Sequence, residues 1–136
     1  MSKANIMKDI VVIDLETSGV DLKTSEILGV SAVLLKSNKV TGLKYETWCN
    51  ASQPMNKNAL SLIGKKEAFF EDQPLTSNVI IALENFIKNA IVVANNPVFC
   101  SNFLYKAGLS QKIEIRDAPN PNAISALINS LLSTLN

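Results

Sequence analysis

Two carboxylates, Asp14 and Glu16, are the side chains of this 136-residue chain whose types and spacing best suit chemistry. They follow the apolar run 10–13 (IVVI), which is typical of a buried strand. Alternate residues of a strand point to the same side, so the two acids are expected to project together while Leu15 turns into the core. Paired carboxylate oxygens suit a hard divalent cation. A buried strand that ends in a polar, solvated turn would carry the same residues, so that alternative stays open.

The stretch from Asp14 to Asp21 (DLETSGVD) resembles the first motif of the DEDD 3′–5′ exonucleases, in particular their DnaQ-like (DNA polymerase III epsilon-subunit-like) branch. The likeness continues in order through 54–64 and 71–74 to 91–100 (IVVANNPVFC), which resembles the second motif, usually V-x-H-N-x-x-F-D. It covers about residues 8 to 107. The resemblance implies an α/β, ribonuclease-H-like fold. In this fold a mixed sheet begins with an antiparallel three-strand meander, β-α units follow, and helices pack on both faces.

The second motif is only partly kept. Asn96 and Phe99 match the family pattern, whereas Asn95 stands where the family usually has His. Cys100 stands at the position of the motif's acid, and a thiol is a poor ligand for Mg²⁺, which prefers oxygen. The resemblance therefore predicts a second motif that has lost its carboxylate.

The third motif of the commonest branch, H-x-A-x-x-D, is not present, and the chain contains no histidine at all. The nearest alignment places Asp117 and Asn122 at the His and Asp positions, which preserves neither role. The spacing Y-x-x-x-D of the tyrosine branch fails after both Tyr45 and Tyr105. Two of four metal-binding carboxylates and the general base are thus unaccounted for.

In the exonucleases that this chain resembles, four carboxylates hold two Mg²⁺ or Mn²⁺ ions around the scissile phosphate. The resemblance implies that Asp14 and Glu16 are the catalytic and metal-binding residues, and that Thr17, Asn96 and Phe99 contact substrate. With two acids missing, Mg²⁺ or Mn²⁺ is expected to bind weakly if it binds at all. A single weakly held cation fits these residues better than a tight two-metal centre.

Two functions follow. The first is an exonuclease-like domain with lost or weakened catalysis, which binds single-stranded nucleic-acid 3′ ends or a protein partner such as a polymerase. The alternative is an active Mg²⁺-dependent 3′–5′ exonuclease on DNA or RNA with a reworked metal site, in which Asp72, Glu114 or Asp117 supplies a substitute ligand. A carboxylate within reach of Asp14 would favour the alternative.

Composition describes one globular domain, 1–136, which is shorter toward its C-terminus than the family pattern. The net charge of +1 excludes a global basic field for nucleic acid, although Lys57, Lys65 and Lys66 form a local cluster. Two cysteines are too few for a disulfide framework and suggest reduced thiols, which fits a cytoplasmic protein. The N-terminus has no long apolar run, so no membrane segment is expected there.

The elements that must position these residues follow from periodicity. We predict a meander of strands at 9–14, 28–36 and 40–49, with Lys44, Glu46 and Trp48 on the more exposed side of the third. A helix at 56–63, a helix capped by Ser77, a strand at 91–94, a helix from Pro97 and an edge strand at 112–115 complete the central part. A final uncharged helix, about 122–135, is expected to close the core, and its polar side would also suit a homodimer contact.

Overall fold

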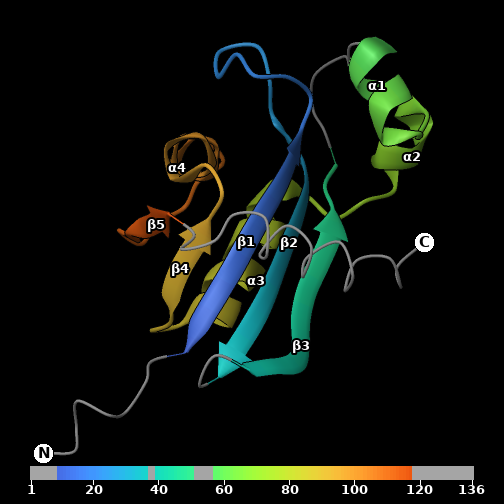
Figure 1. The fold of residues 1–136 in the computed structure, drawn as a ribbon. Helices are drawn as coiled ribbons and strands as arrows, with labels where there is room; N and C mark the ends of the chain where they lie inside the picture. Colours follow the sequence, from blue (N-terminus) through green and yellow to red (C-terminus); the bar gives the residue numbers. More distant parts are fainter. Residues whose placement is uncertain (1–8, 37–38, 51–56, 118–136) are drawn as a thin grey trace, which may run out of the picture.

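The computed structural model describes residues 9–36, 39–50 and 57–117, and the structural statements that follow concern these ranges (Figure 1). The elements occur in the order expected from the periodicity, with one additional short helix. They are β1 (Ile10–Thr17), β2 (Ile27–Lys36), β3 (Lys39–Trp48), α1 (Lys57–Ile63), α2 (Glu67–Glu71), α3 (Thr76–Ile87), β4 (Ile91–Ala94), α4 (Pro97–Lys106) and β5 (Ile115–Asp117).

The five strands form one sheet in the order β3-β2-β1-β4-β5. β1 pairs antiparallel with β2, and β2 pairs antiparallel with β3, as the short connections require. β4 pairs parallel with β1, and β5 pairs parallel with β4. The structure therefore confirms a mixed sheet that begins with an antiparallel meander, and β1 lies in its middle (Figure 1).

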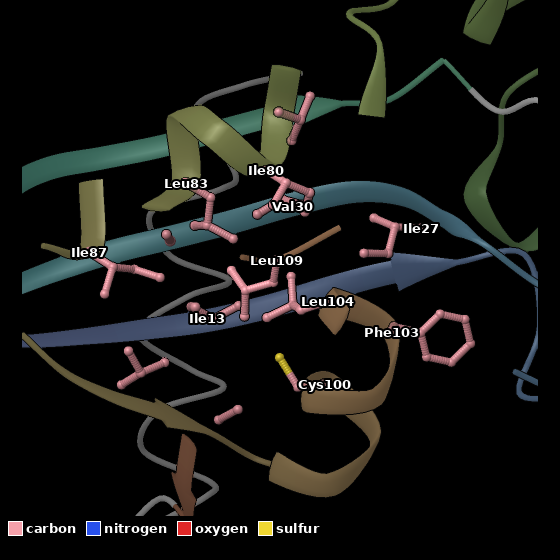
Figure 2. Close-up of a cluster of buried hydrophobic side chains, with 14 of the residues drawn as sticks. Ile13, Ile27, Val30, Ile80, Leu83, Ile87, Cys100, Phe103, Leu104 and Leu109 are labelled. Atoms are coloured by element: carbon pink, nitrogen blue, oxygen red, sulfur yellow. The ribbon is translucent and has the colours of Figure 1, made fainter. Parts of the chain in front are cut away.

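One face of the sheet, here called the helix face, carries the main core. Its strand residues are apolar at every second position because they must bury against helices. Figure 2 shows side chains of α3 and α4 packed over this face. The buried members include Val11, Ile13, Val30, Ala32, Val92 and Ala94 from the strands and Val79, Ile80, Leu83, Ile87, Phe103 and Leu104 from the two helices.

The opposite face is apolar at one end and polar at the other. Val12, Val33 and Val93 are buried there, with at most 5% of each residue exposed. Among the described residues, α3 and α4 both pack on the helix face. The predicted final helix at 122–135 lies outside the described residues.

Three details differ from the sequence-based expectations. α3 begins at Thr76 and is not capped by Ser77, because the isolated bridge between Asn50 and Leu75 fixes Leu75 as the extended residue before the helix. The short helix α2 had no clear periodic signal. The last strand occupies Ile115–Asp117 instead of 112–115, because Ile115 is the residue that pairs with Val92.

A loop from Ser18 to Glu26 follows β1 and is held by hydrogen bonds at both ends. The Ser18 N–H donates to the Glu26 carbonyl, and the Glu26 N–H donates to the Ser18 hydroxyl, each at 3.0 Å. From α4, the Lys106 ammonium donates to the carbonyls of Leu22 and Ser25, the latter at 2.6 Å. The backbone after the acid pair is thus fixed against the helix that follows β4.

Within the described ranges, no helix has the length and apolar character needed to cross a membrane.

Candidate functional site

Asp14 and Glu16 lie near the carboxyl end of β1 and are both exposed, while Leu15 between them is half-buried against the core cluster. The alternation expected from the sequence is therefore present, and the two acids share the face opposite the helix face. A bulge follows them at Glu16/Thr17 in the pairing with β2. Bulges commonly re-aim side chains near functional sites, so this one marks the end of the acid-bearing segment.

Both carboxylates have raised pKa values, and Asp14 contributes to the shift of Glu16. Loss of water around the group raises the pKa of Asp14, although a hydrogen bond from the Leu15 backbone opposes that rise. The pKa of Glu16 is also raised, first by loss of water and then by the negative charge of Asp14. A divalent cation between the carboxylates would reverse both effects because it stabilises their charged forms.

Thr17 and Asn96 each have a local structural role. The Thr17 hydroxyl donates to the Gly19 carbonyl at 2.7 Å, which shapes the turn after the acids. The Asn96 side chain accepts from the Phe99 N–H at 3.3 Å and caps α4, while Pro97 takes the first helical position. Contact of Thr17 and Asn96 with a substrate stays a prediction.

Phe99 is half-buried and contributes to the packing of α4. Its ring centroid lies 4.7 Å from that of Phe103 in a tilted arrangement, and it contacts the core cluster. The neighbouring Val98 is 70% exposed. The predicted substrate contact of Phe99 is therefore limited to the part of its ring that the core leaves uncovered.

Cys100 occupies the first turns of α4 and is only 4% exposed. Figure 2 shows its sulfur directed from α4 into the buried cluster. Burial, and after it the charge of Asp14, raises the pKa of the thiol to about 12. The group is therefore neutral near pH 7 and sits close enough to Asp14 to feel its charge.

None of the three predicted substitute carboxylates completes a metal cluster with the acid pair. In the described ranges, no group of three His, Cys, Asp or Glu side chains is arranged to hold a metal ion. Asp117 pairs with Ala94, which belongs to the helix face, so the register places it on the wrong side of the sheet. Glu114 is engaged by Arg116 at 3.6 Å, and Asp72 lies at the end of α2.

Glu46 is an acid that the sequence reasoning placed on an exposed side and that the structure buries. Asp14 pairs with Ser31, and Ser31 pairs with Glu46, so all three lie in one row on the face of Asp14 and Glu16. The Glu46 side chain is 3% exposed, with the Lys44 ammonium 3.5 Å away. Neither of its carboxylate oxygens has a hydrogen-bond partner. Burial raises the pKa of Glu46, and Lys44 opposes that rise.

A pocket of about 440 Å³ opens between this acidic row and α1. Glu16, Ser31 and Glu46 form its sheet side, and Leu62 and Lys65 come from the region of α1. The Lys65 ammonium lies 4.6 Å above the Phe69 ring, which positions its charge. The predicted cluster Lys57, Lys65 and Lys66 lines one hollow that runs along α1. Acidic and basic groups thus flank the same end of the sheet.

Solved structures of exonuclease I share this fold. A product-bound exonuclease I aligns with a TM-score of 0.71 and 12% identity, covering 88% of this chain and 31% of that chain. An Escherichia coli exonuclease I in complex with an oligonucleotide aligns with a TM-score of 0.67 and 12% identity, covering 82% of this chain and 28% of that chain. The fold is therefore ribonuclease-H-like, as expected.

A family model described as an exonuclease (RNase_T) matches residues 11–129, so the chain belongs to this exonuclease family, and its relatives are DnaQ-like. It is 32% identical over 103 residues to a DNA polymerase III PolC-type protein of Caldanaerobacter subterraneus, which covers 76% of this chain. It is 24% identical over 127 residues to the DNA polymerase III epsilon subunit of Salmonella typhimurium, which covers 89% of this chain. The chain spans 7% of the first relative and 51% of the second.

Proposed function

We propose that this exonuclease-family domain binds single-stranded nucleic-acid 3′ ends with the help of one divalent cation and has lost most or all of its hydrolytic activity. The observation that carries this proposal is Cys100, which stands at the position of the second-motif acid. Its thiol is buried, and burial followed by the charge of Asp14 raises its pKa, so it is neutral near pH 7. A two-metal hydrolysis needs both ions held around the scissile phosphate. A neutral side chain at this position removes one of the charges that would hold the second ion.

The absence of any histidine supports the same proposal, because the usual base of the commonest branch has no candidate in the sequence. Removal of a positioned base commonly costs 10²–10⁴-fold in rate. Together with a missing ion, such losses raise the barrier by several kcal/mol, and each ~1.4 kcal/mol is tenfold in rate. Binding depends less on these groups than hydrolysis does.

The acid pair fits a divalent cation. Asp14 and Glu16 share one face, and loss of water raises the pKa of each, while the charge of Asp14 raises that of Glu16 further. Carboxylate oxygens are the ligands that Mg²⁺ and Mn²⁺ prefer. Such a cation, when bound, would supply a positive charge for a phosphate oxygen. Thr17 and the loop held by Lys106 would present backbone donors beside it.

Single-stranded nucleic acid is the proposed ligand because the fold relatives include an exonuclease I solved with an oligonucleotide. Glu16, at the carboxyl end of β1, lines the same pocket as Lys65. A cation and a lysine together would offset the repulsion between the carboxylates and phosphates. The relatives named as DNA polymerase III components make a polymerase the protein partner to test first.

An active exonuclease is the second candidate, favoured by the intact spacing and shared orientation of Asp14 and Glu16. The two candidates are separated by incubating 5′-labelled single-stranded DNA or RNA with the protein and Mg²⁺ or Mn²⁺. We expect cation-dependent binding by fluorescence anisotropy and little or no shortening on a gel. Asp14→Ala should weaken the cation-dependent binding, and Glu114→Ala, an exposed acid, should not. Robust shortening that Asp14→Ala abolishes would overturn the non-catalytic proposal.

A further inference from the structure

A hollow of about 750 Å³, here called the far hollow, lies at the end of the sheet away from the acid pair. Its lining comes from the residue before β1, from β2 and β3, and from the turn between α3 and β4 (Figure 1). Ile10, at the start of β1, pairs with Leu35 near the end of β2 and with Ile91 at the start of β4. A strand rises ~3.3 Å per residue, so Glu16 lies about 20 Å from Ile10 along β1. The far hollow is therefore separate from the acid pair.

The inner lining of the far hollow is apolar. Leu34, Phe86 and Ala90 line it and pack against the core cluster of the helix face. The Phe86 ring lies 6.4 Å from the Tyr45 ring, centroid to centroid, in a tilted arrangement. Leu43, from β3, also lines the hollow and is 55% exposed. This lining offers a firm apolar surface to an apolar side chain of a ligand, and the volume is typical of ligand pockets.

Lysines surround that apolar lining. Lys36, Lys44 and Lys88 line the far hollow, and Asp9 is the acid among its described lining residues. Lys44 lies 3.5 Å from Glu46, whereas the side chains of Lys36 and Lys88 are exposed. The whole chain has a net charge of only +1, so this end of the sheet concentrates positive charge that the composition does not reveal.

Lys88 is held in an unusual backbone conformation. It ends α3 with a φ of 49°, and its N–H donates to the Glu84 carbonyl at 3.0 Å. Within the described ranges it is the one residue other than glycine with a positive φ. Glycine or asparagine usually takes such a position after a helix because a larger side chain is disfavoured there. Strained residues cluster at binding sites, so the conformation is a second reason to assign a role to this side chain.

The basic surface continues beyond the turn between α3 and β4. A second hollow of about 420 Å³ shares residues 87–90 with the far hollow, so Lys88 lines both. Lys112 and Arg116 line the second hollow, and Glu114 lies 3.6 Å from Arg116. An extended ligand could thus run from one hollow to the other and meet positive charge on both sides of the turn.

The chemistry of this surface favours an acidic peptide over nucleic acid. Single-stranded nucleic acid binds through basic grooves with aromatic faces on which bases stack. Phe86 supplies the ring among the described lining residues, and it is half-buried against Tyr45. The chain's own residues 1–8, which precede Asp9 and lie outside the described ranges, carry two lysines and no acid, so their charge does not match.

We propose that this end of the sheet is a docking surface for an acidic segment of a partner protein. An apolar side chain of that segment enters the far hollow, and its aspartate or glutamate side chains lie against Lys36 and Lys88. Such charge complementarity speeds association and selects the partner. The inference goes beyond the proposed function, which concerns the opposite end of the sheet, and does not depend on it.

The test is fluorescence anisotropy with the labelled peptides DDLFDD, DDSSDD and KKLFKK. We expect wild type to bind DDLFDD, more weakly as salt rises, and to bind the other two at least tenfold more weakly because one lacks apolar side chains and the other has the wrong charge. The double variant Lys36→Glu/Lys88→Glu should bind DDLFDD at least tenfold more weakly than wild type and should gain affinity for KKLFKK. That gain also shows that the variant folds.

Two further variants complete the comparison. Leu43→Ser should weaken binding of DDLFDD severalfold because it removes part of the apolar lining. Lys23→Glu is the matched control, because Lys23 is an exposed lysine in the loop after β1 and does not line either hollow. It should leave binding of DDLFDD unchanged.

Three results would overturn the proposed docking surface. The first is a wild-type protein that does not bind DDLFDD, or binds it no better than the double variant does. The second is a loss of single-stranded oligonucleotide binding in the double variant, which would assign the surface to nucleic acid. The third is a wild-type dimer in sedimentation that the double variant converts to monomer, which would assign it to a second copy of the chain. The proposed function is decided separately, by oligonucleotide binding in Asp14→Ala.

Discussion

The charge of the Asp14 carboxylate reaches the thiol of Cys100, and burial together with that charge raises the pKa of the thiol to about 12. The thiol is therefore neutral in the folded protein near pH 7. Cys100 thus adds no charge and no hard ligand for Mg²⁺ to the surroundings of Asp14. This one relationship separates the site from the four-carboxylate pattern that its family resemblance implies.

Restoring an acid at position 100 should strengthen cation binding. We predict that Cys100→Asp increases Mn²⁺ affinity at least tenfold, because it adds an oxygen ligand and a negative charge beside Asp14. Without Mn²⁺ the same variant should be less stable than wild type by about 1–3 kcal/mol, because a charge is buried next to another of the same sign. Calorimetric titration and urea unfolding measure the two effects.

The control for that variant is Cys100→Asn, which has nearly the shape of aspartate without its charge. Its Mn²⁺ affinity should stay near that of wild type. Equal gains in the Asp and Asn variants would show that side-chain charge at position 100 does not reach the cation.

Both cysteines should be inert in the folded protein. Burial is the main reason that the pKa values of Cys49 and Cys100 are each raised from 9.0 to about 12. The thiolate is the reactive species, so native protein should resist iodoacetamide at about pH 8 while protein in concentrated guanidinium chloride reacts at both sites. Mass spectrometry counts the alkylated thiols. Rapid labelling of Cys100 in native protein would contradict the burial seen here.

The same shifts give a pH dependence of stability. Below about pH 9 the thiols are protonated in both folded and unfolded chains, so they contribute no slope. Between pH 9 and 12 the unfolded chain releases these protons while the folded chain keeps them, so the free energy of unfolding should fall as the pH rises. Urea unfolding at several alkaline pH values tests this. In Cys49→Ala and Cys100→Ala variants the alkaline slope should be smaller.

Glu84 should be important for stability because it organises the chain between α4 and β5. Its carboxylate accepts from the Ser110 hydroxyl at 2.9 Å and 3.2 Å, and from the backbone N–H groups of Ser110 and Gln111 at 3.5 Å and 3.2 Å. We predict that Glu84→Ala lowers the free energy of unfolding by about 2–3 kcal/mol. As a control, Glu114→Ala removes an exposed partner of Arg116. It should change the free energy of unfolding by less than about 1 kcal/mol. Equal effects would show that the Glu84 bonds contribute little.

Gly19 should tolerate no side chain while Ser25 keeps its hydroxyl. A Cβ on Gly19 would lie 2.5 Å from Ser25 Oγ, and Ser25 is 4% exposed, so that hydroxyl has little freedom to move away. We predict that Gly19→Ala costs about 1–3 kcal/mol of stability through this overlap. In a Ser25→Ala background the same substitution should cost markedly less. A double-mutant cycle measures the coupling, and additive effects would refute it.

Several features of this protein follow from its sequence alone. The apolar run at 10–13 and the alternation through Asp14, Leu15 and Glu16 predicted the buried central strand and the shared face of the two acids, because strand periodicity is local. The order of elements and the antiparallel start of the sheet followed from short connections and apolar spacing. The missing second-motif acid at Cys100 was visible directly.

Only the tertiary structure decided which acids of other strands share the face of Asp14 and Glu16 and which do not. Register across β1, β2 and β3 brings Glu46 into the row of Asp14, and register across β4 and β5 keeps Asp117 on the helix face. The sequence indicated an exposed Glu46 because alternation fixes the side of a strand but not what covers that side. Helix α2 was likewise missed, because its aromatic residues Phe69 and Phe70 pack on Trp48 across the fold. Contacts between residues far apart in the chain leave no pattern in the local sequence, so strand pairing and side-chain packing were known only from the structure.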